Sequence, residues 1–191
     1  VGGTISNGTL IGNHTTINAS LSRIINNCKL AGTWSIKEVY PQWFGAVGNG
    51  VNDDTAAIQS AIDTRIPVFL PNGTYILTSS LVISNENAMY NIEGYNGLAL
   101  CGAESTKLII TKNIPAIIVR GYSNLLRDLN LSFESAIRSR YTSALLEVQS
   151  LASNSVKQSC FNIFENIRCC DNVNAAGGSG YYGTGIRLVS D

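Results

Sequence analysis

The stretch Trp43–Thr78, WFGAVGNGVNDDTAAIQSAIDTRIPVFLPNGTYILT, contains the residues that decide the fold. Its glycines indicate turns, and Asn52-Asp-Asp-Thr55 indicates a helix start, because aspartate accepts hydrogen bonds from the free N–H groups of a first helical turn. The apolar residues that follow recur at helical spacing, at Ala57, Ile58, Ala61 and Ile62. We therefore expect a short capping α-helix near residues 54–63, placed over the open end of a stack of strands.

Two short apolar runs follow the predicted helix. Val68-Phe-Leu70 and Tyr75-Ile-Leu77 flank Pro71-Asn-Gly-Thr74, which has the composition of a tight turn between strands. The order of parts suggests a cap followed by a repetitive structure. Function would then lie on a long stacked surface.

Internal repeats support this interpretation. Ile5–Gly12 aligns with Ile25–Gly32 at an offset of 20 residues, about one coil of a parallel β-solenoid. Downstream, apolar pairs recur at changing offsets. The predicted steps from a residue to its counterpart in the next coil are Leu98 to Ile117, Leu108 to Leu129, Ile117 to Leu146 and Asn124–Leu131 to Asn162–Cys169.

In each pair the two apolar residues share one strand face and would fill the interior. The residues between them would face outward, as we expect for Asn130, Glu147, Arg168 and Arg187. The last strand, near Gly185–Val189, would leave an open apolar end, which natural solenoids cap. The sequence therefore predicts an N-terminal fragment of a longer protein. Residues 1–40 form a strand-rich layer in this prediction, and residues 41–191 form the capping motif and first coils.

The composition excludes several classes of partner. Only 14% of the 191 residues are charged and the formal net charge is zero, which gives no electrostatic case for binding nucleic acid or an acidic membrane surface. No apolar run is long enough to span a bilayer, and no signal peptide is visible.

The cysteines and acidic residues predict no metal and no cofactor. The five cysteines include no CxxC, and the single His14 cannot complete a zinc set. We interpret the cysteines as small core residues of a chain made in a reducing compartment. Asp53-Asp54 offers too few oxygen ligands for calcium and is sufficiently explained as a helix cap.

The segments Trp43–Asp63 and Val68–Ile83 together resemble the start of the pectate-lyase-like right-handed parallel β-helix family, which includes bacteriophage tailspikes, pre-neck appendage proteins and capsule depolymerases. The shared pattern is a WFGA-like segment, a Gly-x-Gly, an Asp-Asp-Thr helix and a Leu-Pro-x-Gly-x-Tyr turn. Asn49 stands where an Asp is common. The resemblance implies an all-β, right-handed parallel β-helix and a homotrimer. It also implies a virion-tail protein that contacts other tail proteins and binds, and often cleaves, a bacterial capsule, O-antigen or exopolysaccharide.

Three carboxylates are the candidate catalytic residues, Glu147, Glu165 and Asp171. Glycoside hydrolysis uses two carboxylates about 5 to 10 Å apart, and one or two coil steps cover that spacing. The same register places Glu147 against Arg187, however. A surface Glu–Arg pair is therefore the alternative explanation for Glu147.

A lyase would need a base and a cation that holds a uronate carboxylate. Arg168 is the candidate cation, with Arg127, Arg138 and Arg140 as further choices, although all four also fit as ordinary surface cations. Tyr181 and Tyr182, in a glycine-rich segment, are candidates for stacking on sugar rings, as is Tyr141.

Three functions remain open. The chain is part of a phage tailspike or tail-fibre depolymerase, a secreted bacterial polysaccharide lyase or epimerase of the same fold, or a non-enzymatic structural module. Because the sites of long solenoids usually lie on middle coils, we expect the 191 residues alone to have no hydrolase or lyase activity.

Overall fold

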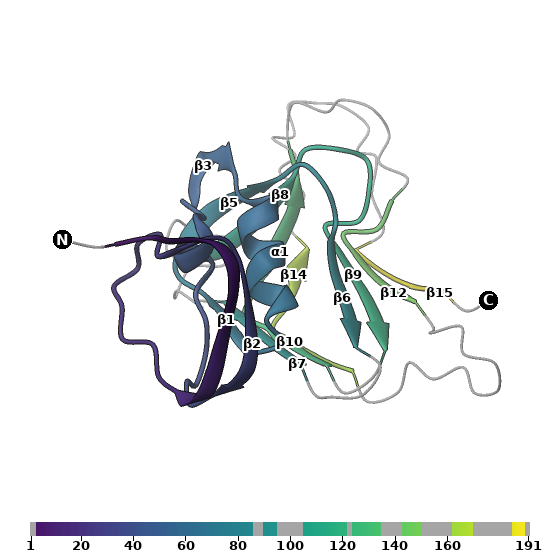
Figure 1. The fold of residues 1–191 in the computed structure, drawn as a ribbon. Helices are drawn as coiled ribbons and strands as arrows, with labels where there is room; N and C mark the ends of the chain where they lie inside the picture. The colour runs from purple at the N-terminus through teal and green to yellow at the C-terminus, as the bar shows by residue number, and fades with distance from the viewer. Residues whose placement is uncertain are drawn as a thin grey trace, which may run out of the picture.

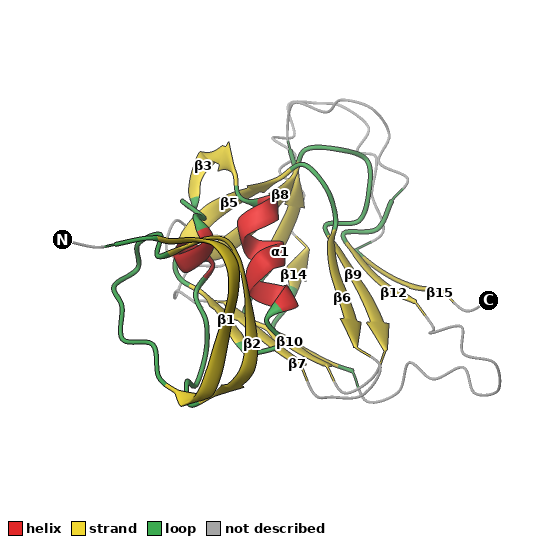
Figure 2. Ribbon diagram, viewed as in Figure 1, coloured by secondary structure: helices red, strands yellow, loops and turns green. Residues whose placement is uncertain are grey.

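The computed structural model describes residues 3–85, 90–94, 105–121, 124–134, 143–149, 162–169 and 185–189 (Figure 1). Within these residues the chain is mostly β-strand, and the strands form parallel sheets (Figure 2). A single α-helix, α1 (Thr55–Asp63), occurs among them, as the apolar spacing predicts. A 3-10 turn, η1 (Pro41–Phe44), precedes it. No helix in the described part of the chain is long and apolar enough to cross a membrane.

After the helix, the chain visits three parallel sheets in turn, so that each strand pairs with the strand three positions away in the chain. The β4 sheet contains β4 (Val68–Leu70), β7 (Tyr90–Gly94), β10 (Asn124–Arg127) and β13 (Ile163–Glu165). The β5 sheet contains β3 (Asn49–Asp53), β5 (Gly73–Leu77), β8 (Thr106–Ile110), β11 (Asn130–Phe133) and β14 (Arg168–Cys169). The β6 sheet contains β6 (Leu81–Asn85), β9 (Ile117–Gly121), β12 (Leu146–Gln149) and β15 (Ile186–Val189).

A separate two-stranded parallel sheet, the ribbon, precedes this stack. It pairs β1 (Ile5–Thr15) with β2 (Ile25–Trp34), and Ile5 lies opposite Ile25 as the 20-residue repeat predicts. Asn27 donates an amide hydrogen bond of 2.9 Å to Asn7, its counterpart in the repeat. Whether residues 1–40 form a domain of their own stays a prediction.

The strand registers confirm two of the four downstream steps. Ile117 lies opposite Leu146, and Asn130 and Leu131 lie opposite Arg168 and Cys169. The step from Leu108 to Leu129 is wrong by two residues, because Leu108 pairs with Leu131. Such a slip keeps every side chain on the same face, so an apolar pattern alone does not detect it.

The predicted step from Leu98 to Ile117 is also wrong. Leu98 lies outside the described residues, but both edges of β9 are occupied, because Ile117 pairs with Leu81 on one side and Leu146 on the other. The repeat at this point is therefore longer than the predicted one.

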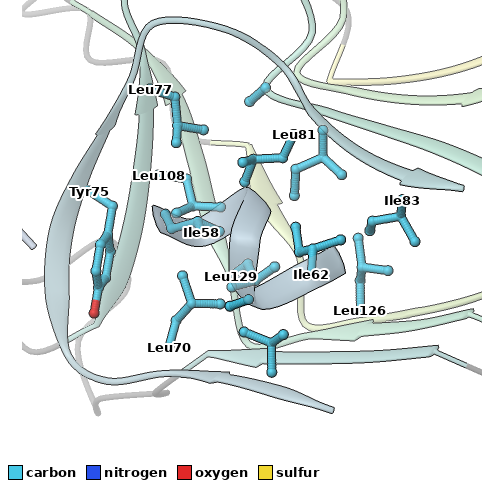
Figure 3. Close-up of a cluster of buried hydrophobic side chains, with 14 of the residues drawn as sticks. Ile58, Ile62, Leu70, Tyr75, Leu77, Leu81, Ile83, Leu108, Leu126 and Leu129 are labelled. Carbon is cyan, nitrogen blue, oxygen red and sulfur yellow. The ribbon is translucent and has the colours of Figure 1, made fainter. Parts of the chain in front are cut away.

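The inner faces of the three sheets and one face of α1 form the core. Figure 3 shows Ile58 and Ile62 of the helix among strand residues that include Leu77, Leu81 and Leu108. All five side chains are at most 4% exposed. The helix thus covers apolar surface at one end of the stack, as a cap does.

Two residues predicted to face outward are buried. Asn130 and Glu147 are both 5% exposed, whereas Arg168 is half-buried and Arg187 is exposed. Strand alternation gives the direction of a side chain but not what covers it. Glu147 is covered in part by its hydrogen-bond partners Arg187 and Gln149.

The interpretation of the cysteines as core residues is wrong for Cys169, which is exposed. Cys169 lies in β14, which pairs with β11 alone within the described strands, so its layer has no neighbour on the other side. Ile163, Ile186 and Leu188 of the same layer are exposed too. Cys28 is half-buried, and both described cysteines are free thiols. Cys101, Cys160 and Cys170 lie outside the described residues.

Candidate functional site

The two motif aspartates have separate structural tasks. Asp54 occupies the N-cap position of α1 but makes no capping hydrogen bond there. Its buried carboxylate instead accepts the backbone N–H groups of Val47 at 2.6 Å and Gly48 at 3.1 Å. Asp53 accepts the first helical N–H, from Thr55, at 3.0 Å, and also the hydroxyl of Thr78 at 2.7 Å. The predicted helix cap is therefore Asp53, and Asp54 holds the glycine-rich turn.

Opposite pKa shifts follow from these contacts. Burial raises the pKa of Asp54, more than the N–H groups of Val47 and Gly48 lower it. Burial also raises the pKa of Asp53, but the hydrogen bonds from Thr55 and Thr78 outweigh it, so that this pKa lies below its usual value. Every oxygen involved has a structural partner, which favours a role in the fold over one in chemistry.

Glu147 lies at the centre of a charged cluster on the β6 sheet. Its carboxylate forms an ion pair with Arg187 of the neighbouring strand, whose Nε donates at 3.0 Å. Gln149 donates to the other oxygen at 2.5 Å, and Arg120 in turn donates to Gln149 at 2.7 Å. The predicted Glu147–Arg187 pair is confirmed.

This cluster makes Glu147 a poor general acid. Burial raises the pKa of Glu147, but the hydrogen bonds from Arg187 and Gln149 and the charges of Arg187 and Arg120 outweigh it, so the pKa lies below its ordinary value. A general acid needs a raised pKa, whereas this carboxylate is ionised and has partners for both oxygens. The geometry favours the ladder pair over catalysis.

Replacing Arg187 by glutamine should lower the free energy of unfolding by roughly 1 to 2 kcal/mol at neutral pH, because it leaves the Glu147 carboxylate buried without its cation. The loss is below that of a fully buried pair, because the Arg187 side chain is 45% exposed. In the wild type the lowered pKa of Glu147 stabilises the fold at pH values above 4.5, the ordinary pKa of a glutamate. This stability is lost as the pH falls through the folded-state pKa.

Urea unfolding between pH 3 and pH 7 measures both effects. In Arg187→Gln the contribution of Glu147 should fall less in acid, because the hydrogen bond and the charge of Arg187, which both lower its pKa, are removed. Lys37→Gln is the control, since the Lys37 side chain is 90% exposed and should leave the profile unchanged. An Arg187→Gln profile parallel to that of the wild type would contradict the role assigned to the pair.

Only some of the other predicted site residues are among the described residues. Glu165 is exposed at the end of β13, opposite the half-buried Arg127, and Arg168 begins β14 in the next sheet. Glu147 belongs to the third sheet, so the strands bring no second candidate carboxylate beside it within the described residues. The remaining candidates lie outside the described residues: Arg138, Arg140, Tyr141, Asp171, Tyr181 and Tyr182.

Arg168 is the end of a polar row on the β5 sheet. The strand registers align Thr74, Lys107, Asn130 and Arg168 on successive strands. Neighbouring strands lie about 4.8 Å apart, a spacing comparable to the length of one pyranose unit. Asn130 donates to the Thr106 carbonyl at 3.2 Å, and its own amide oxygen has no hydrogen-bond partner among the described residues. We call these four residues the polar row.

Lys107 and Asn130 are not among the binding residues predicted from the sequence. Their alignment with Arg168 follows from strand pairing at unequal offsets, and a correct register for Leu108 would have revealed it. The turn before Arg168 is firmly held, because Asn166 donates to Asp128 at 2.7 Å and both residues have positive φ. Because the Asn130 side chain is buried, the row can supply the two cations Lys107 and Arg168 to a chain of hydroxyl and carboxylate groups.

The described residues contain no group of three or more His, Cys, Asp or Glu side chains that could hold a metal ion.

Comparison with known proteins gives one family match and one structural similarity of low score. Residues 42–125 match the family described as rhamnogalacturonase A/epimerase, pectate lyase-like. Among solved structures, the chain is similar to ORF18 of Geobacillus virus E2, with 16% identity and a TM-score of 0.37 over 81% of this chain and 48% of that one. The chain thus spans about half the length of the viral protein. No curated protein matches.

Proposed function

We propose that this chain forms part of a phage tailspike or tail-fibre protein, built as a trimeric right-handed parallel β-helix, that binds and in its full-length form degrades a bacterial surface polysaccharide. The observation that carries the proposal is the match of residues 42–125 to a pectate-lyase-like family. In this chain the matched residues cover the cap helix and the first strands of all three parallel sheets.

The polar row provides the surface for this function. A polysaccharide repeats its hydroxyl groups along its length, and the β5 sheet aligns polar residues from strand to strand, of which Lys107 and Arg168 are not buried. Lys107 and Arg168 would hold acidic groups of the saccharide. Asn130 lies between them in the register but is only 5% exposed, so Lys107 and Arg168 are the groups of the row that would meet the saccharide.

Two alternatives keep the same fold. A secreted bacterial lyase or epimerase is favoured by the family description, which includes an epimerase. A non-enzymatic structural module is favoured by the Glu147–Arg187 pair, because it occupies the one buried candidate carboxylate of the described residues. The neighbouring genes distinguish the first alternative. Tail genes beside this one would support the phage protein, and sugar-utilisation genes would support the secreted enzyme.

The test is binding and cleavage on a panel of bacterial capsules, O-antigens and exopolysaccharides. We expect the full-length protein to bind one of them and release shorter saccharides, while the 191 residues alone bind without turnover. Because each cation contributes a charge-assisted hydrogen bond, Lys107→Gln combined with Arg168→Gln should weaken binding at least tenfold.

Lys112→Gln, an exposed lysine outside the row, is the matched control and should bind as the wild type does. If the full-length protein neither binds nor cleaves any polysaccharide on a broad panel, the proposed function is wrong. Binding without any released product would instead support the structural alternative.

A further inference from the structure

A groove of about 930 Å³ lies between the ribbon, α1 and β6, away from the polar row. Figure 1 shows the ribbon curving past the helix, and both elements line the groove. Its volume is within the range of about 300 to 1,000 Å³ that is typical of ligand sites. We call it the ribbon groove.

The walls of the ribbon groove are held by contacts that need no ligand. The Gln59 amide pairs with the backbone of Val82, donating at 3.0 Å and accepting at 2.9 Å, which fixes α1 against β6. On the other side, the Trp43 indole donates to the Ser20 carbonyl at 3.1 Å and the Ile24 N–H donates to the Trp43 carbonyl at 3.1 Å. The groove is therefore preformed, which lowers the entropic cost of binding.

The charged groups of the groove favour an anion. Lys29 of β2 and Arg65, just after α1, both line it, and neither has an ion-pair partner among the described residues. Asp63 is the one acidic side chain of the lining, and one of its oxygens already accepts from Gln59 at 2.9 Å. This local excess of positive charge contrasts with the zero net charge of the chain.

Arg65 is also conformationally unusual. Its φ of 61° is left-handed, at a position two residues after the end of α1 where glycine is the common residue. An arginine in this conformation costs about 1 kcal/mol relative to glycine. This conformation ends the helix, with the Arg65 N–H donating to the Ile62 carbonyl at 3.1 Å, and it places Arg65 on the groove.

We propose that the ribbon groove binds a short acidic oligosaccharide, with a sugar carboxylate between Lys29 and Arg65 and sugar hydroxyls on Asp63 and Ser84. The inference rests on the proposed function and adds a second saccharide site to it. Polar groups lie on all three walls, together with apolar residues such as the half-buried Leu30. A lipid tail or apolar peptide face would bury these charges unpaired, whereas a sugar ring has hydroxyl groups for them and an apolar face for Leu30.

The experiment is isothermal titration of the 191-residue chain with tetragalacturonate, a hyaluronan tetrasaccharide and an alginate tetrasaccharide, and with neutral maltotetraose. We expect at least one acidic probe to bind, more weakly at higher salt, and maltotetraose to bind at least tenfold more weakly. Lys29→Gln and Arg65→Gly should each weaken binding of the acidic probe about tenfold.

Arg65→Gly also excludes unfolding as the cause of weaker binding. Glycine adopts the left-handed conformation of residue 65 without strain, so the variant should not lower the melting temperature. Lys37→Gln, an exposed lysine outside the groove, is the matched control and should bind as the wild type does. Equal binding by the two groove variants and the wild type would overturn the inference. A change in their oligomeric state would do the same, because it would assign the groove to a protein contact.

The failure of this inference differs from that of the proposed function. If wild-type protein binds a bacterial polysaccharide but no acidic tetrasaccharide, or if only Lys107→Gln and Arg168→Gln reduce tetrasaccharide binding, the groove site is wrong and the proposed function stands. If the wild type binds no saccharide of either kind, both are wrong.

Discussion

Replacing Gly48 by alanine should lower the free energy of unfolding by roughly 3 kcal/mol, the sum of a backbone cost and a steric cost. Gly48 has a φ of +66°, which costs an alanine about 1 kcal/mol. A Cβ at this position would lie 2.8 Å from Cε1 of Tyr75, inside any normal contact. The alanine therefore requires either the loop or the ring to move.

The Tyr75 ring has no room to yield. It is fully buried, and its hydroxyl donates to the Pro71 carbonyl at 2.9 Å and accepts from the Gln42 amide at 2.8 Å. The backbone on the other side is also close, because a Cβ at Gly73 would lie 2.8 Å from the Gly48 carbonyl oxygen. Overpacking of this kind costs roughly 1 to 3 kcal/mol.

Gly50→Ala is the matched control. Gly50 has a similar φ of +76°, but its Cβ would meet the Thr74 methyl at an ordinary 3.4 Å. Its substitution should cost only the backbone term of about 1 kcal/mol. Urea unfolding of both variants isolates the steric term as their difference. Equal losses would show that Tyr75 does not constrain the turn.

These glycines illustrate what the sequence can predict. The turn, the helix at residues 55–63 and the following strands all depend on neighbouring residues, so local patterns were sufficient to predict them. The close approach of Gly48 to Tyr75 joins residues that the helix separates in the chain. A pattern of turn residues indicates that a glycine is needed, but it does not indicate which side chain excludes a Cβ.

The prediction of strand pairing from the sequence has the same limit. The offsets of 20 and 38 residues were predictable because whole segments repeat, with Ile5 against Ile25 and Leu131 against Cys169. The pairing of Ile117 with Leu81 was not, because loops of unequal length separate strands of similar composition. The polar row depends on such pairing, so Arg168 was a candidate from the sequence while Lys107 was not.

Burial was the least predictable property of the candidate site. Alternation along β12 correctly places Glu147 opposite in direction to Leu146 and Val148, yet all three are buried. Coverage comes from Arg187, 40 residues later in the chain. The chemical state of a carboxylate thus depends on a distant partner. The predicted register did place Arg187 against Glu147, but it gave an exposed pair and not a buried carboxylate.

Replacing Asp54 by alanine should lower the free energy of unfolding by roughly 3 kcal/mol as well. Asp54 is 1% exposed, and its carboxylate is the acceptor for the N–H groups of Val47 and Gly48. Alanine would leave both donors without this acceptor, and each lost partner costs about 1 to 3 kcal/mol. Asp63→Ala, an exposed site at the far end of the same helix, should change stability by less than about 0.5 kcal/mol.

The isosteric variant Asp54→Asn separates hydrogen bonding from charge. Its stability should lie between those of the wild type and Asp54→Ala, because an amide offers one acceptor oxygen for two N–H groups. In the wild type the folded-state pKa of Asp54 is raised above 3.8, so the stability linked to this group falls as pH rises through that pKa. The deficit of Asp54→Asn relative to the wild type should therefore shrink from acid to neutral pH, as measured by urea unfolding. A deficit that grows with pH would mean that Asp54 favours its charged form and that the loop N–H groups outweigh its burial.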